Sequence, residues 1–453
     1  MEFSSVTLRI ALATVPSARR WWVAYSGGVD SHCLLHALAS IAAELPELIA
    51  VHVDHGLNPE SERWAQHCAS ICAGLRVPYR LLQVKVQSDS GEGLEAAART
   101  ARYAALARVM AFGEVLFTAH HLDDQAETVL LQLLRGAGSR GLAAMPALAA
   151  FHAGYLVRPL LNHSRAELLA YAHAAGLAWV DDDDNLNQRH DRNYLRHQIF
   201  PLLQQRWPAA ALTFARTATH QAEATSLLES LAAQDIAQLT RPRSNTLPVA
   251  PMLGLGPARA RNLLRFWIRD NGHAVPSTAI LERVLAEAAM ARQDATPLIS
   301  WTNSELRRYR NLLYLMKPLP DLPLPDWELE WNDLETPLRL HWGILTAQPL
   351  IGVGLSELAR IQGITVRLRQ GGERCRLAGT THHRPLKDLW QAAGIPPWER
   401  TRTPLLFVNG VLAAVPGFGP CHCFQASAGE IGWKIEWQFT HGQIDQEYSR
   451  HRF

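Results

Sequence analysis

A glycine-containing turn from Tyr25 to Ser31, the glycine turn, combines residue types that suit a phosphate ligand. It reads Tyr-Ser-Gly-Gly-Val-Asp-Ser, follows the apolar run 21–25 and opens a helical pattern. Adjacent glycines let the backbone adopt positive φ and approach a ligand closely. A helix N-terminus offers unpaired N–H groups and partial positive charge to an anion. Asp30 is an anion in the same turn, which is sensible if it holds Mg²⁺ that the phosphates bring. The turn therefore predicts a nucleotide phosphate site.

Two common nucleotide-binding signatures do not fit the glycine turn. It lacks the spacing and the lysine of G-x-x-x-x-G-K-[ST], which argues against a Walker A site. It also lacks G-x-G-x-x-G, which argues against a dinucleotide-binding fold. An ordinary strand–turn–helix with glycines for tightness is the alternative that the turn alone leaves open.

Polar clusters follow two more apolar runs. Asp54 to Asn58 come directly after Val53, and His120 to Thr128 come directly after Ala119. Ligands of open parallel sheets bind outside the carboxyl ends of the strands, so three such clusters predict one active site within residues 1–130. Asp123 and Glu127 share one helix face by their i, i+4 spacing. Two alternatives stay open, a helix-dipole or N-cap role for the acids and a transition-metal site with the histidines.

The elements that position these clusters alternate along the chain. Apolar runs at 21–25, 48–53, 79–84 and 114–119 predict strands, and the segments 29–44, 59–74 and 92–111 have helical length. This alternation predicts an α/β domain with a parallel, helix-covered sheet over residues 1–210. Residues 211–322 predict a helical domain, with no clear strand in 211–295. Four prolines in 317–326 predict a linker, and alternating runs with Asn409-Gly410 predict that residues 323–453 hold the linker and a small α+β domain.

Composition limits the class of protein. Of 453 residues, 48% are hydrophobic and 19% charged, which excludes a disordered or fibrous chain and predicts two or three domains. Neither a signal peptide nor a membrane-length apolar run is evident, so we expect a cytoplasmic protein without membrane contact. The formal net charge of +2 favours no particular partner. Residues 361–410, however, hold eight Lys/Arg and three Asp/Glu, a local +5 that suits RNA, with a solvated charged face as the alternative.

The six cysteines are sparse and predict no disulfide scaffold. Cys68 and Cys72 lie four apart on a helical segment and are expected in a core. Cys421 and Cys423, together with Cys375, hint at zinc, although their spacing is not C-x₂-C.

The glycine turn resembles the PP-loop signature of the N-type ATP pyrophosphatases, which cleave ATP between the α and β phosphates and adenylylate a substrate oxygen. Further strings are similar, in order, to the tRNA(Ile)-lysidine synthetase family over nearly the whole chain. They occupy 50–57, 93–103, 121–128, 134–142, 158–161, 191–196, 265–267, 306–310, 384–387 and 394–398. The acidic run 181–184 departs from the family's usual text, so the role of this loop stays open.

The resemblance implies ATP-dependent ligation of L-lysine to carbon 2 of the wobble cytidine in the isoleucine tRNA with a CAU anticodon, through an adenylylated tRNA. ATP and Mg²⁺ would be required. A homodimer is compatible with the sequence, which does not fix the oligomeric state.

The resemblance also implies roles for residues of this chain. Asp30 would hold Mg²⁺, and a nearby carboxylate or His121 would take the proton of the lysine amine. The residues expected at the chemistry are Asp30, His121, Asp123, Asp124 and Glu127; those expected at ATP are Ser26, Gly27, Gly28, Val29, Asp30, Ser31, Val53 and His55; those expected at tRNA are Arg99, Arg102, Arg135, Arg192, Arg196, Arg384 and Lys387.

Other functions remain alternatives. A tRNA thiolase shares the glycine turn but needs catalytic cysteines, and Cys33 has no Cys-x-x-Cys partner. A glutamine amidotransferase would need a cysteine nucleophile where Met1-Glu2 stand. A non-catalytic tRNA-binding protein would not need Asp30 beside the glycines.

Overall fold

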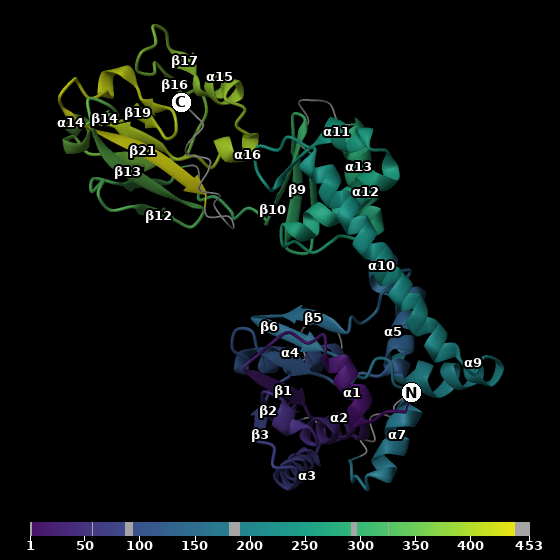
Figure 1. The fold of residues 1–453 in the computed structure, drawn as a ribbon. Helices are drawn as coiled ribbons and strands as arrows, with labels where there is room; N and C mark the ends of the chain where they lie inside the picture. Colours follow the sequence, from purple (N-terminus) through teal and green to yellow (C-terminus); the bar gives the residue numbers. More distant parts are fainter. Residues whose placement is uncertain are drawn as a thin grey trace. The chain divides into compact units, whose positions relative to one another are not determined.

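The computed structural model describes residues 2–56, 58–86, 94–180, 191–290, 297–324 and 326–439. The chain divides into two compact units, Met1–Leu228 and Glu229–Phe453 (Figure 1). The division falls inside one long helix, α10 (Ala210–Ala237). The finer division at residues 210 and 322 remains our prediction. The acidic run 181–184 lies outside the described residues.

The first unit is built on a six-stranded sheet in the order β3-β2-β1-β4-β6-β5. Its strands are β1 (Arg20–Ala24), β2 (Glu47–Asp54), β3 (Tyr79–Gln83), β4 (Val115–Phe117), β5 (Leu148–Phe151) and β6 (Gly154–Val157). The neighbours from β3 through β6 pair in parallel, and β5 pairs antiparallel with β6. The predicted α/β class and its first four strands are confirmed. The β5–β6 hairpin extends the sheet beyond that prediction.

Helices of this unit cover the sheet, as its near-continuous apolar strands require. The helices of the unit are α1 (Ser5–Leu12), α2 (Val29–Ala39), α3 (Ser61–Gly74), α4 (Leu94–Val109), α5 (Leu122–Leu134), α6 (Ser139–Leu142), α7 (Arg165–Ala174), α8 (Asp191–Tyr194) and α9 (Phe200–Arg206), with short turns η1 (Ala42–Glu44) and η4 (Leu195–Ile199). Of these, α9 packs with α5 and α10 in a cluster beside the sheet. Cys68 and Cys72 lie in the core with Val23, Phe117 and Leu168, as predicted. Core packing thus holds the central strands β1 and β4 in place. The carboxyl ends of these strands lie at one edge of the sheet, which is positioned by the same packing.

The second unit begins with helices that carry a four-stranded antiparallel sheet, β7-β10-β9-β8. Its elements are β7 (Thr246–Pro248), α11 (Val249–Gly254), α12 (Pro257–Asp270), α13 (Thr278–Met290), β8 (Leu298–Trp301), β9 (Ser304–Tyr309) and β10 (Leu312–Met316). The predicted helices are present. The expectation of no strand in 211–295 misses β7, whose three residues are too few to give a periodic signal.

The remainder of the second unit holds short, mostly antiparallel strands and three small helices. These are β11 (Glu328–Glu330), β12 (Leu338–Leu340), β13 (Gly343–Ile351), β14 (Leu355–Ser356), α14 (Glu357–Ile361), β15 (Thr365–Arg367), β16 (Arg374–Cys375), β17 (Arg384–Pro385), α15 (Leu386–Ala392), α16 (Pro397–Arg400), β18 (Leu405–Val408), β19 (Val411–Val415), β20 (Gly419–Pro420), η5 (His422–Phe424) and β21 (Ile431–Phe439). Asn409 and Gly410 form the predicted two-residue hairpin, with φ of 49° and 76°.

Cys375 and Cys421 form a disulfide, a single cross-link that the sparse cysteines do not predict. It joins two of the three cysteines considered for zinc, so only Cys423 of that set keeps a free thiol. The zinc interpretation therefore loses its ligands.

Candidate active site

The glycine turn links the carboxyl end of β1 to the start of α2, as its sequence predicts. Gly27 has a φ of +89°, and Gly28 is the N-cap residue of α2 with no side chain capping it. Ser26 and Ser31 brace the turn, because their hydroxyl oxygens lie 3.1 Å apart and the Ser31 hydroxyl donates to the carbonyl of Gly28. The first N–H groups of α2 are thus left for a ligand, which suits a phosphate.

Gly27 tolerates no side chain, whereas its neighbour Gly28 does. A Cβ on Gly27 would lie 3.0 Å from the Cys68 Sγ in addition to the strain of positive φ, but a Cβ on Gly28 would meet nothing closer than 3.6 Å. We expect Gly27→Ala to lower the free energy of unfolding by about 1–3 kcal/mol and to weaken ATP binding. Gly28→Ala is the matched control and should unfold like the wild type; denaturant unfolding and ATP titration measure both. Equal stability of the two variants would contradict this account.

The acids that follow β4 gather around one histidine. His121 is the N-cap of α5, so the alternative of an acid as N-cap does not hold, and the His121 backbone N–H donates to the Asp124 carboxylate over 3.0 Å. The His121 Nε2 lies 3.4 Å from Asp124 Oδ2 and 3.6 Å from Asp30 Oδ2, and its Nδ1 lies 3.5 Å from Asp123 Oδ2. The carboxyl end of β1 and the carboxyl end of β4 thus bring Asp30, His121, Asp123 and Asp124 together.

Charge and burial set the protonation of the two histidines in opposite directions. Burial alone would lower the pKa of His121, but Asp123, Asp30 and Asp124 outweigh it and raise that pKa to about 10. Burial lowers the pKa of His120 to about 3, and Arg158, Arg192 and Arg99 add to this effect against Asp124. The imidazole of His121 is therefore a cation within the acidic cluster, and the imidazole of His120 beside it is neutral.

Glu127 is held by two arginines rather than left open. Its side chain is 2% exposed; Arg192 Nε donates to Oε2 over 2.8 Å, and Arg196 Nε donates to Oε1 over 2.6 Å. Arg196 also reaches Asp124 Oδ1 over 2.9 Å. Arg192 and Arg196, which the family resemblance places at tRNA, are thus engaged with acids that it places at the chemistry.

The other predicted residues of this unit lie on β2, α4 and α5 and the turns that follow them. Val53 is the penultimate residue of strand β2. His55 follows the strand, and its buried Nδ1 has no hydrogen-bond partner within the described part of the chain. The guanidinium carbons of Arg99 and Arg102 lie 5.1 and 5.7 Å from the centre of the Tyr103 ring. Arg135 ends α5 and is exposed.

Arg158 is a residue of this edge to which the sequence reasoning assigned no role. It follows β6 directly, is buried, and donates from Nη1 to the carbonyl of Pro146 over 2.7 Å. Arg158 directly follows the short apolar run 154–157, which forms β6. Because this run was not predicted as a strand, the residue after it was not recognised as a strand-end residue.

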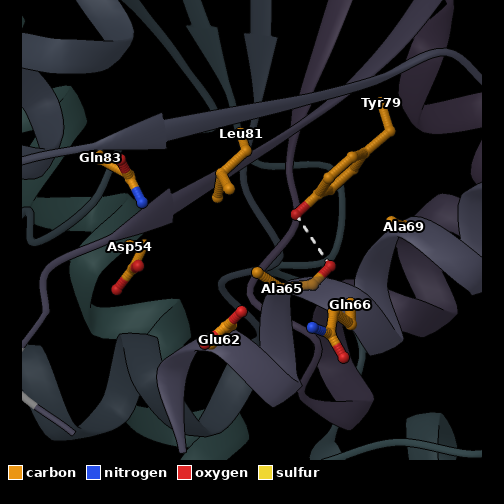
Figure 2. A pocket seen from close by; sticks show the side chains of 8 residues that line it. All are labelled: Asp54, Glu62, Ala65, Gln66, Ala69, Tyr79, Leu81 and Gln83. Atoms are coloured by element: carbon orange, nitrogen blue, oxygen red, sulfur yellow. Dashed lines mark hydrogen bonds between the residues drawn. The ribbon is translucent and has the colours of Figure 1, made fainter. Parts of the chain in front are cut away.

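A separate hollow of about 390 Å³ opens between α3 and the edge strand β3 (Figure 2). Asp54, Glu62, Gln66, Tyr79, Leu81 and Gln83 line it with two alanines, and the Tyr79 hydroxyl donates to the Ala65 carbonyl. Asp54 of the polar cluster after β2 lines this hollow, but none of the residues assigned to ATP, to tRNA or to the chemistry does. The glycine turn and the strand ends therefore remain the candidate nucleotide site.

The predicted metal ligand, Asp30, keeps one buried carboxylate oxygen, Oδ1, without a hydrogen-bond partner among the described residues. No group of three or more His, Cys, Asp or Glu side chains suited to a metal occurs in the described ranges. Mg²⁺ at nucleotide sites is held by one or two carboxylates with phosphates and water, so the single orphaned oxygen fits that ion. A three-ligand transition-metal site has no such support.

In the second unit, the predicted tRNA residues Arg384 and Lys387 are exposed. Arg384 lies on the β16–β17 ribbon opposite Cys375, and Lys387 lies in α15. Arg374 of the same ribbon is exposed as well. These three are the exposed cations of the basic segment 361–410, whereas Arg367, Arg369, Arg376 and Arg402 are half-buried.

The strand order, the glycine turn and the acids at the strand ends define a PP-loop nucleotide-binding protein. The description "PP-loop domain" matches residues 4–203, "TilS substrate binding domain" matches 247–314, and "TilS substrate C-terminal domain" matches 364–437.

Curated relatives are similar over nearly the whole length. The tRNA(Ile)-lysidine synthase of Alkalilimnicola ehrlichii is 45% identical over 441 residues, covering 94% of this chain and 96% of the relative. Those of Coxiella burnetii and Serratia proteamaculans are 42% and 40% identical, covering 94% and 93% of this chain and 95% and 96% of the relatives. The chain belongs to the tRNA(Ile)-lysidine synthase family, as the sequence resemblance indicated.

Proposed function

We propose that this protein uses ATP to join L-lysine to carbon 2 of the wobble cytidine in the isoleucine tRNA with a CAU anticodon. The observation that carries the proposal is the meeting of the uncapped glycine turn, Asp30 and the acids of α5 at one sheet edge, in a chain with family-wide similarity. ATP, lysine and tRNA are substrates, and AMP and pyrophosphate are released.

The first step is adenylylation of the cytosine. The N–H groups at the start of α2 and the glycine turn, Ser26 to Ser31, bind the phosphates of ATP, with Val53 beside the adenine and His55 near phosphate. The base's O2 attacks the α-phosphorus and pyrophosphate leaves. Asp30 would hold Mg²⁺ through its orphaned oxygen, and the ion would neutralise charge on the phosphates.

The second step is attack by the lysine ε-amine on carbon 2, from which AMP leaves. The amine must first lose a proton. His121 is buried, and both its ring nitrogens already face carboxylates, so an incoming amine reaches the carboxylates more readily. Asp123 keeps a partly exposed carboxyl group and is the proton acceptor that we favour.

The paired arginines suggest how lysine gains access to the acids. Arg192 and Arg196 occupy Glu127, so a cationic amine must compete with them. Phosphates of a bound tRNA would attract both guanidinium groups, together with Arg99, Arg102 and Arg135 on this unit and Arg384 and Lys387 on the other. When Arg192 and Arg196 move from the acids to these phosphates, Glu127 and Asp124 would become accessible to the lysine.

A tRNA thiolase is the alternative that shares this turn. Its chemistry needs reactive thiolates, whereas Cys33 is fully buried and burial raises the pKa of its thiol to about 12. That environment favours the ligase.

No helix among the described residues is long and apolar enough to span a membrane. We place the enzyme in the cytoplasm with its tRNA substrate, and a homodimer stays a prediction.

The test is incorporation of lysine. The chain is incubated with ATP, radiolabelled lysine and an isoleucine-tRNA transcript, and label in the tRNA is counted. We expect one lysine per tRNA, no incorporation when the wobble cytidine is replaced by uridine, and none without ATP. Thiolation, or tRNA binding with no label, would overturn the proposal.

A further inference from the structure

Two sequence strings that the active site does not use meet inside the second unit. The first, 306–310, runs along β9, and the second, 394–398, enters α16; Figure 1 shows α16 beside β9 and β10. Trp398 of α16 is 7% exposed. Its ring centre lies 5.2 Å from that of Tyr314 and 6.3 Å from that of Tyr309, both at near-perpendicular angles. These three rings form a small buried cluster of their own.

A buried arginine binds the two sides of this cluster. Arg400 is 9% exposed, and its Nη2 donates to the Tyr309 hydroxyl over 2.7 Å while its Nε donates to the Ile395 carbonyl over 2.6 Å. In the other direction, Arg307 of β9 approaches α16, and its guanidinium lies 5.5 Å from the centre of the Trp398 ring. Burying a guanidinium is costly unless its donors are satisfied, so this arrangement persists only while both sides stay in place.

Further polar contacts surround the rings. Arg243 Nη1 lies 3.3 Å from Glu399 Oε1, and Arg310 donates to the Gln391 carbonyl. Arg402 Nη2 donates over 3.0 Å to the carbonyl of Pro320, within the proline-rich segment. The segment 317–324 is therefore bound to the domain that follows it as well as to the strand that precedes it.

We call this group of contacts the seam; it consists of Arg243, Arg307, Tyr309, Arg310, Tyr314, Trp398, Glu399 and Arg400. The seam takes part of the basic segment 361–410 away from the RNA contact that its charge predicts. Arg400 belongs to it and is buried, the half-buried Arg402 donates to the Pro320 carbonyl next to it, and Trp398 is enclosed by it. They are unsuited to RNA contact, which leaves Arg374, Arg384 and Lys387 as the exposed cations.

We propose that the seam makes the sheet β7–β10 and the C-terminal domain one rigid body, so that Tyr309, Trp398 and Arg400 act as positioning residues that present both domains to a single tRNA. A tRNA is a long and stiff ligand. Two weak contact surfaces that are held at a fixed spacing bind such a ligand far more tightly than the same surfaces on a flexible tether. The activity measurement below rests on the proposed function, whereas the calorimetric one does not.

The first variant is Trp398→Ala in the full chain. We expect KM for the tRNA transcript to rise about tenfold or more, because the fixed spacing is lost. The kcat at saturating tRNA and KM for ATP should stay near wild type, since the glycine turn is untouched. A merely misfolded fraction would lower kcat and leave KM unchanged. In calorimetry, the unfolding transition of the second unit should split into two.

The second test exchanges the charges of the seam and does not depend on a large cavity. Glu399→Arg and Arg243→Glu each place like charges together and should raise KM for tRNA, and the double exchange should restore it to within about threefold. The exposed pair Arg261–Glu282, 3.2 Å apart on α12 and α13, is the matched control. Glu282→Arg should change neither KM nor the calorimetric transition.

The outcomes separate clearly. A raised KM with a split transition and rescue by the double exchange supports the proposal. A split transition with unchanged KM, a single transition in all seam variants, or no rescue overturns it. Failure of wild-type lysine incorporation would instead refute the proposed function, and the calorimetric result would still decide whether the seam couples the domains.

Discussion

Replacing Asp30 by alanine is expected to lower the rate of tRNA adenylylation on the order of 1,000-fold while leaving tRNA affinity within about twofold. The substitution removes a carboxylate that belongs both to the start of α2 and to the acidic cluster around His121. Its orphaned Oδ1 is the oxygen that fits Mg²⁺. Without it, negative charge on the departing pyrophosphate loses its counter-ion. Release of pyrophosphate and labelled AMP-tRNA are measured with purified transcript, and tRNA affinity is measured by filter binding.

The matched control for Asp30 is Glu62→Gln. Glu62 is a carboxylate of the same unit, but it lines the separate hollow beside β3 (Figure 2). We expect wild-type adenylylation from this variant. Asp30→Asn should resemble Asp30→Ala, because an amide oxygen is a much weaker ligand than a carboxylate. Wild-type adenylylation by Asp30→Ala would remove this residue from the chemistry.

The location of the site could be predicted from the sequence because its signals are local. Each cluster directly follows an apolar run, and the carboxyl ends of β1, β2 and β4 share one edge in any right-handed parallel sheet. Asp30 and His121 therefore come together for topological reasons, and His55 follows β2 at the same edge. The glycine turn adds positive φ at Gly27, which its residue type alone makes expected.

The partners within the site could not be predicted, because they come from distant segments. Arg192 lies 65 positions beyond Glu127 in the chain and still takes its carboxylate. The same holds for Arg400, which the local count of basic residues assigns to RNA and which the structure buries against Tyr309, 91 positions earlier. Charge counts along a segment do not tell which side chains face solvent. Only the packing of the whole unit decides that.

The β-strands outside the first sheet illustrate a second limit. β7 has three residues and gains its place by pairing with β10, across the length of α11, α12 and α13. A three-residue run carries no measurable alternation, so its pairing is a consequence of the fold and not a local signal. The helices of the same region, with their long amphipathic patterns, are predictable.

Glu127→Gln is expected to separate the two chemical steps. Glutamine keeps the size of the side chain but removes the charge that holds Arg192 and Arg196 and that would receive the lysine amine. Losing one partner of a buried, hydrogen-bonded charge pair costs about 2–5 kcal/mol, which predicts a rise in KM for lysine on the order of 100-fold. Adenylylation depends on the glycine turn and Asp30, so AMP should still reach the tRNA.

The variant should therefore accumulate adenylylated tRNA, detected as label from α-phosphate-labelled ATP on the transcript, while labelled lysine is incorporated slowly. Glu223→Gln, a change at an exposed carboxylate of α10, is the control and should not accumulate it. Asp30 and Glu127 form their ion pairs with different residues: Asp30 faces His121, and Glu127 faces Arg192 and Arg196, so we expect each to fail without the other. Loss of adenylylation in Glu127→Gln would show instead that the arginine-held acid is needed for the first step, and that Arg192 and Arg196 organise the cytosine site through it.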